Sequence, residues 1–499
     1  MSVFAPLPLG QRIPASLHAV SCSLPTMREV RGYEQKDPAV TRHLTSGYPR
    51  FVVHPLLHEL TASLSRQQGL AGHTLWLVSS AAMADRLAAH LGAAHVTRVS
   101  DHGVHGIAHP EAPGLAARAK TFLQNVGGFL SSRAAEDELV CRGLRVAAEP
   151  EELFAGDALA AVRRELRFAF PGTADADLLL ANCGMNAVDA AFRAIADLQA
   201  ARGRTVWIQL GWLYLDTIAI LQKFTRTPGD YVQVRDVFDL AGLERVFATH
   251  AGRVAGIVAE VPTNPLIQTP AVAGIAALAR QHGARVILDP SVTSAFNLEI
   301  LPHADVVATS LTKYAANAGD LTAGLVVVNP AAPDAAALRA GIANKIEPLY
   351  PRDLARLAVE IGRTREVLAR IHASVPRVVA FLEKHPAVRD VFWALHPASR
   401  ANYLRVARAP GFVGSMITFT LRGALDKFYD RLRLPKGPSF GMTTTLICPF
   451  MYLAHYDLVT TEAGRAELAA SGLDPDLLRL SVGTEPADDI IGALAEALG

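Results

Sequence analysis

The stretch ADVVATSLTKYAANAGD, residues 304–320, decides the fold and centres on one lysine, Lys313. An apolar run (Val306, Val307, Ala308) followed by hydroxyl residues is typical of a buried strand that ends in a polar tip. A lysine at a partly desolvated strand end can have a lowered pKa and act as an amine nucleophile, as Schiff-base chemistry requires. The alternative is a solvated surface lysine after a strand, and residues elsewhere in the chain decide between the two.

Similar apolar runs recur through the middle of the chain and alternate with helical patterns. Near-continuous Val, Ile and Leu strands separated by helices indicate a largely parallel sheet covered on both faces, with ligands at the carboxyl ends of the strands. The expected strands are 177–182, 205–210, 255–261, 285–290, 304–310 and 324–329, and the expected helices lie near 185–200, 215–224, 236–248 and 271–283.

The two ends of the chain have different patterns from the middle. Residues 1 to about 50 are rich in Pro, Ser and Thr and predict an extended arm that lies on a partner surface. A helix, strand and helix from residue 54 predict a small α/β insertion to about 113, followed by helical sequence at 115–144 that breaks at Gly127-Gly128. We therefore predict an N-terminal part (1–150), a large domain (151–349) and a smaller α+β domain (350–499). The last contains helices at 352–371 and 374–385 and strands at 416–421 and 477–482.

Composition excludes several classes of partner. The chain has 499 residues and a formal net charge of +1, without a basic run or basic domain that would attract nucleic acid or a membrane surface. The four cysteines are widely spaced and form no Cys/His cluster, so no metal site is expected. We expect these cysteines to be reduced thiols in a cytoplasmic protein. The N-terminus lacks the pattern of a signal peptide, and no stretch reaches the roughly 18 apolar residues of a membrane span.

Asp289 ends the strand that precedes the one leading to Lys313. Alone, an aspartate at a strand end is more often a turn cap. In a parallel sheet, however, the two neighbouring strand tips present a carboxylate and an amine on the same edge. Pyridoxal phosphate needs this pair, a lysine for the Schiff base and an anion for its pyridine nitrogen.

A possible phosphate cradle lies at the turn between the strand 177–182 and the next helix. Gly184 and Met185 follow Cys183 there, so backbone N–H groups at a helix start could hold a dianion. A lone glycine turn is more often only a connection. Ser310 and Thr312, next to Lys313, would complete the cradle with hydroxyl groups.

These residues belong to a set of blocks that resembles a known family. The chain resembles the γ-family of pyridoxal-phosphate enzymes of cysteine and methionine metabolism, typified by cystathionine γ-synthase. Seven blocks carry the resemblance: CGM (183–185), LYLDT (213–217), EVPTNPLIQTP (260–270), ILDPSVTSAF (287–296), ADVVATSLTKY (304–314), FLEKHPAVRDV (381–391) and RLSVGTE (479–485). HAVSCSLPT (18–26), GYPRFVVHP (47–55) and GFLSSRAAEDEL (128–139) are similar to the longer, fungal-type enzymes. The resemblance implies the three-layer, aspartate-aminotransferase-like fold (fold type I) with a smaller C-terminal α+β domain.

The resemblance also implies roles for individual residues. Lys313 would form the Schiff base and move protons, Tyr214 would stack on the ring, and Asp289 would pair with the ring nitrogen. Gly184, Met185, Ser310 and Thr312 would bind the phosphate. Asn264, Ser439 and Arg479 would bind the substrate, the arginine holding its α-carboxylate through a bidentate contact.

Each of these residues has a structural alternative when considered alone. Tyr214 lies among Trp212, Leu213 and Leu215 and would be a core or interface residue. Arg479 would form a structural salt bridge, and Asn264 before a proline would be a turn residue. The whole constellation favours the functional interpretation.

The sequence departs from the family pattern at three places. Leu215 and Asp216 stand where the family has two glycines, and Ala318-Gly319-Asp320 replaces His-Ser-Asp and keeps only the acid. The arm that reaches the phosphate of a neighbouring subunit has two candidates, Tyr48-Pro49-Arg50 and Ser131-Ser132-Arg133. We favour Arg133, because it leads into a helix as the family arm does.

The resemblance implies a pyridoxal-phosphate-dependent transferase of transsulfuration. It would carry out γ-replacement on an O-acyl-homoserine, with cysteine as the nucleophile and cystathionine as the product. A γ-lyase or sulfhydrylase on the same scaffold, an unusual nucleophile, and a non-catalytic binding subunit are the alternatives. The acyl group and the nucleophile stay open. The family also implies a homodimer or homotetramer with shared active sites.

Overall fold

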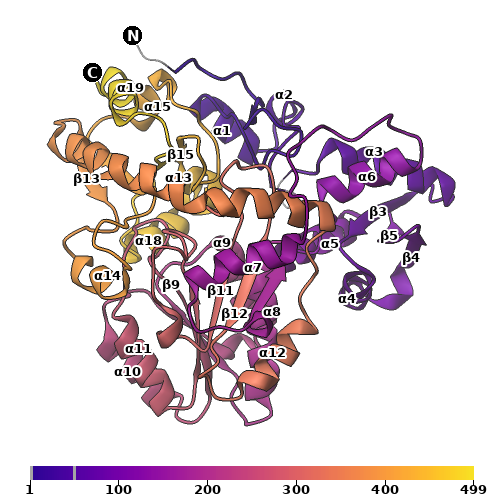
Figure 1. Cartoon of the computed structure of the whole chain (residues 1–499), viewed down its shortest axis with the longest axis horizontal. Coiled ribbons are helices and arrows are strands. Elements are labelled where there is room, and N and C mark those ends of the chain that lie inside the picture. Colours follow the sequence, from indigo (N-terminus) through magenta and orange to yellow (C-terminus); the bar gives the residue numbers. More distant parts are fainter. Residues whose placement is uncertain (1–3, 49–51) are drawn as a thin grey trace.

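The computed structural model describes residues 4–48 and 52–499 and arranges them around one large sheet (Figure 1). Its seven strands have the order β6-β12-β11-β10-β9-β7-β8. In chain order they are β6 (Leu178–Ala181), β7 (Val206–Leu210), β8 (Tyr231–Val234), β9 (Val254–Glu260), β10 (Arg285–Asp289), β11 (Val306–Ser310) and β12 (Gly324–Val328). The α/β fold is confirmed, and all six expected strands form. The short edge strand β8 was not predicted.

The sheet is parallel from β11 to β8, but β12 runs antiparallel to both β11 and β6. Because β10 and β11 are parallel neighbours, Asp289 and Lys313 follow strand ends on the same edge, as predicted.

Helices cover both faces of this sheet and form two apolar cores. One face packs on α8 (Gly184–Ala200), α9 (Leu215–Phe224) and α12 (Ala335–Ala343). The other packs on α7 (Ala158–Ala169), α10 (Leu240–Thr249), α11 (Val272–Gln281) and α13 (Pro351–Lys384). Successive strand residues alternate between the two cores, for example Val306 and Val307, so β11 is buried on both sides. This is the three-layer arrangement that the sequence predicted.

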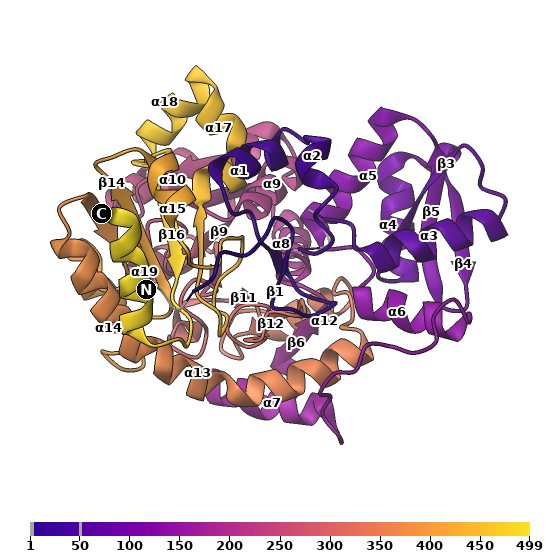
Figure 2. The ribbon, with the colours of Figure 1, turned by 90° about the horizontal axis from the view of Figure 1, so that it is seen from above.

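An insertion domain, residues 55–141, lies to one side of the sheet (Figure 2). It consists of α3 (Pro55–Gln67), β3 (His73–Val78), α4 (Ala81–Leu91), β4 (Thr97–Asp101), β5 (Val104–Pro110), α5 (Pro113–Val126) and α6 (Ser132–Cys141). The sheet order is β3-β5-β4, all antiparallel. The β4–β5 hairpin was not predicted. Its tight turn is made by His102 and Gly103, which both have positive φ, as a two-residue hairpin turn requires.

Residues 4–48 differ from the predicted extended arm. After the short β1 (Arg12–Ile13) and β2 (Ser21–Cys22), they form α1 (Met27–Glu34) and α2 (Pro38–Thr41). Thr26 and Glu29 cap α1 reciprocally. Helix α1 packs on the C-terminal part of the same chain, where the N–H of Met27 donates to Asp430 and Arg31 makes two hydrogen bonds to Asp426.

The C-terminal part begins with α13, a single helix where we expected two. Pro376 lies inside it, and the neighbouring Val375, Val378 and Val379 are almost completely buried. Burial of this face outweighs the hydrogen bond lost at proline. A four-stranded antiparallel sheet follows, in the order β13-β14-β16-β15. The remaining elements are β13 (Val388–Phe392), α14 (Arg400–Val406), β14 (Met416–Leu421), α15 (Leu425–Arg431), β15 (Leu446–Pro449), α16 (Phe450–Ala454), α17 (Tyr456–Thr460), α18 (Glu462–Ala470), β16 (Leu478–Ser481) and α19 (Ala487–Leu498).

The domain boundaries predicted at residues 150 and 349 fall in the loops before α7 and α13. No helix among the described residues has both the length and the apolar character needed to span a bilayer.

Candidate active site

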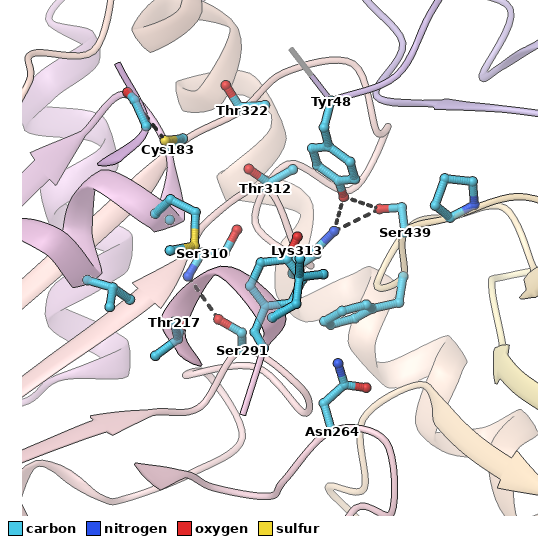
Figure 3. Close-up of a pocket in the computed structure, with 18 of the residues that line it drawn as sticks. Tyr48, Cys183, Thr217, Asn264, Ser291, Ser310, Thr312, Lys313, Thr322 and Ser439 are labelled. Carbon is cyan, nitrogen blue, oxygen red and sulfur yellow. Dashed lines mark hydrogen bonds between the residues drawn. The ribbon is translucent and has the colours of Figure 1, made fainter. Parts of the chain in front are cut away.

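A cavity of about 180 Å³ opens at the carboxyl ends of the parallel strands. Residues from the N-terminal arm, the insertion domain, the large domain and the C-terminal part all line it (Figure 3). The cavity therefore depends on segments that are distant in sequence.

Lys313 projects into this cavity from the loop after β11. Its Nζ donates to the hydroxyl of Ser439 over 2.9 Å and to the hydroxyl of Tyr48, and these two hydroxyls are 2.6 Å apart (Figure 3). The rings of Tyr48 and Phe440 lie 4.4 and 4.7 Å from Nζ. Burial, and then the nearby charge of Arg479, hold the pKa of Lys313 well below its ordinary value. The structure thus places a buried amine with a lowered pKa in the cavity instead of a solvated surface lysine.

Asp289 lies at the end of the neighbouring strand β10 and also lines the cavity. Its Oδ1 accepts hydrogen bonds from the N–H and the hydroxyl of Ser291, at 2.8 and 2.6 Å. Burial raises the pKa of Asp289 to about 6, although the hydrogen bonds from Ser291 oppose this shift. Asp289 therefore caps the turn and also presents a carboxyl group to the cavity, so the two alternatives coexist.

Glu260 is a second carboxyl group at this edge, and we did not single it out from the sequence. It is paired with Asp289 across the β9–β10 ladder, is 4% exposed and lines the cavity. Its Oε1 accepts from the N–H of Tyr214 (2.5 Å) and its Oε2 from the N–H of Asn264 (3.1 Å). Burial, and then the proximity of Asp289, raise the pKa of Glu260 well above its usual value. In the sequence, Glu260 ends an apolar strand pattern just as Asp289 does, and this position could have identified it as a candidate site residue.

The predicted phosphate cradle is assembled from α8 and the loop after β11. Gly184 and Met185 form the first turn of α8, and both line the cavity with Ser310 and Thr312. A Cβ at Gly184 would lie 2.7 Å from the Cβ of Ser310, so only glycine permits this close approach. The Thr312 hydroxyl also bonds the backbone of Ala323. The cradle thus combines a helix N-terminus with two hydroxyl residues, which suits a dianion.

Arg479, in β16, also lines the cavity. Its Nη1 donates to Oδ1 of Asn264 over 3.3 Å, and its guanidinium lies 4.5 Å from the ring of Phe450. Burial lowers the pKa of Arg479. Within the described part of the chain, no carboxylate is within ion-pair distance of this side chain, so the alternative of a structural salt bridge is not observed. Arg479 and Asn264 are available together for a carboxylate ligand.

Tyr214 precedes α9 and lines the same cavity while its ring also contacts the core around α8. Its backbone N–H is fixed by Glu260, which places the ring beside the strand tips. The structure thus brings together every predicted site residue discussed so far.

Arg133 is the exception. It does not line the cavity, and its guanidinium is 1% exposed among Glu151, Asp353 and the carbonyl oxygen of Asp320. The structure gives this arginine a buried ion-pair role and leaves no donor directed at a phosphate site of this chain. The competing segment does reach the cavity through Tyr48, although Arg50 lies outside the described residues.

The donor set fits pyridoxal phosphate. A buried lysine, a carboxyl group on the neighbouring strand, a helix N-terminus with two hydroxyl residues, and a tyrosine ring lie around one cavity. They would hold, respectively, the aldehyde, the pyridine nitrogen, the phosphate and the ring face.

Comparisons with known proteins agree with this set. A family model described as "Cys/Met metabolism PLP-dependent enzyme" matches residues 172–499. The chain is 40% identical to L-2-amino-4-chloropent-4-enoate dechlorinase/desaturase of Streptantibioticus cattleyicolor, over 97% of each chain. It is 26% identical to cystathionine gamma-synthase of Neurospora crassa, over 99% of this chain and 98% of that protein.

Among solved structures, cystathionine gamma synthase from Xanthomonas oryzae pv. oryzae superposes with a TM-score of 0.57. The superposition covers 69% of this chain and 86% of that chain at 21% identity, which supports the fold. The family model, the full-length relatives and the cavity lead to one conclusion: the chain belongs to the pyridoxal-phosphate-dependent enzymes of cysteine and methionine metabolism.

Proposed function

We propose that the protein eliminates a leaving group from Cγ of an L-α-amino acid, with pyridoxal phosphate as cofactor. The charges in the cavity carry this proposal. Among the described residues that line it, the acidic and basic side chains are Lys313, Asp289, Glu260 and Arg479. The first two serve the cofactor, and Glu260 is held by two backbone N–H groups, which leaves Arg479 for one α-carboxylate.

A cysteine nucleophile would bring a second carboxylate and an ammonium group into the same cavity. Burying these charges without partners is costly. Another part of the lining is instead apolar and includes Phe129, Leu130 and Leu215. Such a wall accommodates a compact, uncharged γ-substituent and disfavours a second amino-acid head group. Elimination is therefore better supported than the γ-replacement with cysteine that the sequence suggested first.

The side chains around the cavity have distinct tasks in this reaction. Arg479 and Asn264 bind the α-carboxylate and orient the Cα–H bond toward Lys313. Nζ of Lys313 would take a proton from Cα and return it to the cofactor-bound substrate, which frees Nζ to take a second proton from Cβ, and the leaving group departs from Cγ with its bonding electrons. Ser439 and Tyr48 hold Nζ in place through hydrogen bonds. Pyridoxal phosphate, when bound, supplies the electron sink for negative charge at Cα.

The 40% identical relative is named as a dechlorinase/desaturase, which supports elimination from an amino acid with chlorine at Cγ. The test is to incubate the holoenzyme with a γ-chloro amino acid and with O-acetyl- and O-succinyl-homoserine, each with and without cysteine. We expect release of the leaving group from the γ-chloro amino acid at a rate that cysteine does not change, and the slowest release from O-succinyl-homoserine, whose γ-substituent is long and charged. A thioether formed in proportion to added cysteine would overturn the proposal.

A second candidate is γ-replacement with cysteine to give cystathionine. The full-length similarity to the Neurospora crassa cystathionine gamma-synthase favours it. The same experiment distinguishes the two, because only replacement consumes cysteine.

We also propose that the protein is a homodimer or a larger homo-oligomer. Exposed apolar side chains gather in the segment between α6 and α7, where Leu144 and Leu153 are 45% and 40% exposed and Val146 is fully exposed. Apolar exposure of this kind suits a protein–protein contact. Sedimentation should show at least a dimer, and a fully active monomer would contradict the proposal.

The cytoplasm is the compartment that we propose. The cysteines Cys22, Cys141, Cys183 and Cys448 are all free thiols, which suits a reducing environment. Fractionation of the source cells, with detection of the protein in the soluble cytoplasmic fraction, tests this assignment.

A further inference from the structure

The insertion domain is fastened to the large domain at the end of α5, directly beside the cavity. The carbonyl oxygen of Gly127 accepts a hydrogen bond from the side-chain amide of Asn182 over 2.8 Å, and Asn186 donates to the carbonyl of Val126 over 3.3 Å. Gly127 has a φ of 68°, and a Cβ there would lie 2.3 Å from Sγ of Cys183. This first fastening joins the insertion domain to the turn that carries Gly184.

A second fastening joins α5 to the start of α9. Asp216 is 1% exposed, and its Oδ1 accepts from the side-chain amides of Gln124 (3.2 Å) and Asn125 (3.0 Å). Lys223, on the same helix α9, donates to Oδ1 of Asn125 over 3.1 Å. We call the set Gln124, Asn125 and Asp216 the α5–α9 latch. A buried carboxylate with two amide donors from another domain fixes the distance between the two helices.

The latch controls which atoms face the cavity. Asp216 is flanked by Leu215 and Thr217, and these two residues line the cavity together with Gln124 of the latch. Tyr214, which begins this segment, is held from the other side by Glu260. The segment 214–217 is therefore fixed between the strand tips and the insertion domain, and Phe129 and Leu130 continue the same wall.

We infer that Asp216 is a positioning residue that holds the insertion domain as a fixed wall of the substrate cavity, with Leu215 limiting the length of the γ-substituent. This inference rests on the proposed function, because it assumes that an L-α-amino acid occupies the cavity. The substrates that fit are α-amino acids with a compact, uncharged group at Cγ. Longer or charged side chains would have to displace Leu215 or break the latch.

Binding of unreactive amino acids tests the inference without turnover. The reconstituted holoenzyme is titrated with L-norvaline, L-norleucine and L-2-aminoadipate, and the change in visible absorption gives a Kd for each. For the wild type we expect norvaline to bind more tightly than norleucine by roughly tenfold, and aminoadipate to bind weakest, since one methylene group is worth about 10-fold or more in a closed pocket. Leu215→Ala should reduce or invert the preference for norvaline.

Variants of the α5–α9 latch distinguish an effect on the position of the cavity wall from an effect on the folding of the protein. Asp216→Ala removes the acceptor and should lower the norvaline preference by about tenfold while speeding amide hydrogen exchange in α5. Asp216→Asn keeps the Oδ1 acceptor and should restore most of the preference. Asp230→Ala is the matched control, because Asp230 is also a buried aspartate that accepts hydrogen bonds from side chains, those of Thr205, Thr227 and Arg253, but does not line the cavity. It should leave the preference unchanged.

Two outcomes would overturn the inference. One is an unchanged norvaline preference in both Leu215→Ala and a folded Asp216→Ala. The other is an equal loss of preference in Asp230→Ala, which would show a general effect of destabilisation. If none of the amino acids changes the spectrum of the wild-type holoenzyme, the proposed function itself fails, which is a distinct result.

Discussion

Asp289 lies directly opposite Glu260 across the β9–β10 ladder, so two buried carboxyl groups end neighbouring strands at the cavity. Only one of the two carboxyl groups, that of Asp289, has a role with the cofactor in the proposed reaction. Asp289 is suited to a pyridine nitrogen, whereas both oxygens of Glu260 accept backbone N–H groups from Tyr214 and Asn264. Glu260 therefore joins the residue that we propose covers the cofactor to a residue that we propose binds the substrate.

We predict that Glu260→Gln lowers kcat/KM by roughly tenfold or more, because the glutamine amide cannot accept the second N–H, and a buried donor without a partner costs about 1–3 kcal/mol. Circular dichroism of the bound cofactor in the visible range should change as well, since the ring of Tyr214 shifts. Glu165→Gln is the control, as Glu165 is a buried glutamate of α7 paired with Arg365. An unchanged dichroism signal in Glu260→Gln would argue against this positioning role.

Lys313→Ala should abolish the visible absorption band that appears when pyridoxal phosphate is added to the wild type. The matched control is Lys436→Met, because Lys436 is also buried and its pKa is lowered to about 8, yet its amine bonds only the backbone carbonyls of Pro25 and Tyr429. This variant should keep the band. A band that persists unchanged in Lys313→Ala would exclude this lysine as the attachment site.

Arg479→Lys should raise KM by about tenfold or more, because a charged hydrogen bond contributes ~1.5–3 kcal/mol and lysine cannot replace a bidentate contact. The visible band of the cofactor should stay unchanged. Arg389→Lys, at an exposed ion pair with Asp390, serves as the control and should keep the wild-type KM. If KM of Arg479→Lys equals that of the wild type, the α-carboxylate is bound elsewhere.

Asp289→Asn should make the stability of the cofactor-free protein less sensitive to pH. Burial raises the pKa of Asp289 from 3.8 to about 6, so the folded state favours the protonated acid. The wild type therefore loses stability relative to the variant as the pH rises from about 4 to about 6, and the difference stays constant above that range. Thermal melts of both proteins across this range measure the effect. A constant difference throughout would show that the pKa is not raised.

The sequence predicted the strand tips well because their signals are local. Val306 and Val307 are apolar on both faces of a strand, and a carboxylate or lysine at the end of such a run has few conformations available. Glu260 carried the same signal and was missed, because it was considered only as part of a longer block. The capping box of Thr26 and Glu29 was likewise visible as Thr-x-x-Glu, but the prolines around it favoured an extended arm.

The features that sequence could not predict depend on contacts between distant residues. The sequence predicted two helices, at 352–371 and 374–385, and the burial of Val375 and Val379 on either side of Pro376 accompanies one continuous α13. The amino-acid pattern near Arg133 matched an arm that leads into a helix. Its actual partners, Asp320 and Asp353, are far along the chain and come from the large domain and α13.

The buried position of Arg133 also has a consequence for synthesis on the ribosome. Asp353, which compensates its charge, lies 220 residues further along the chain. At a synthesis rate of about 5–20 residues per second, roughly 10–40 seconds pass between the two. During this interval Arg133 can pair with Glu151, which follows it by 18 residues, but not with Asp353. The set of carboxylates that surrounds Arg133 in the folded chain is thus complete only when α13 has been synthesised.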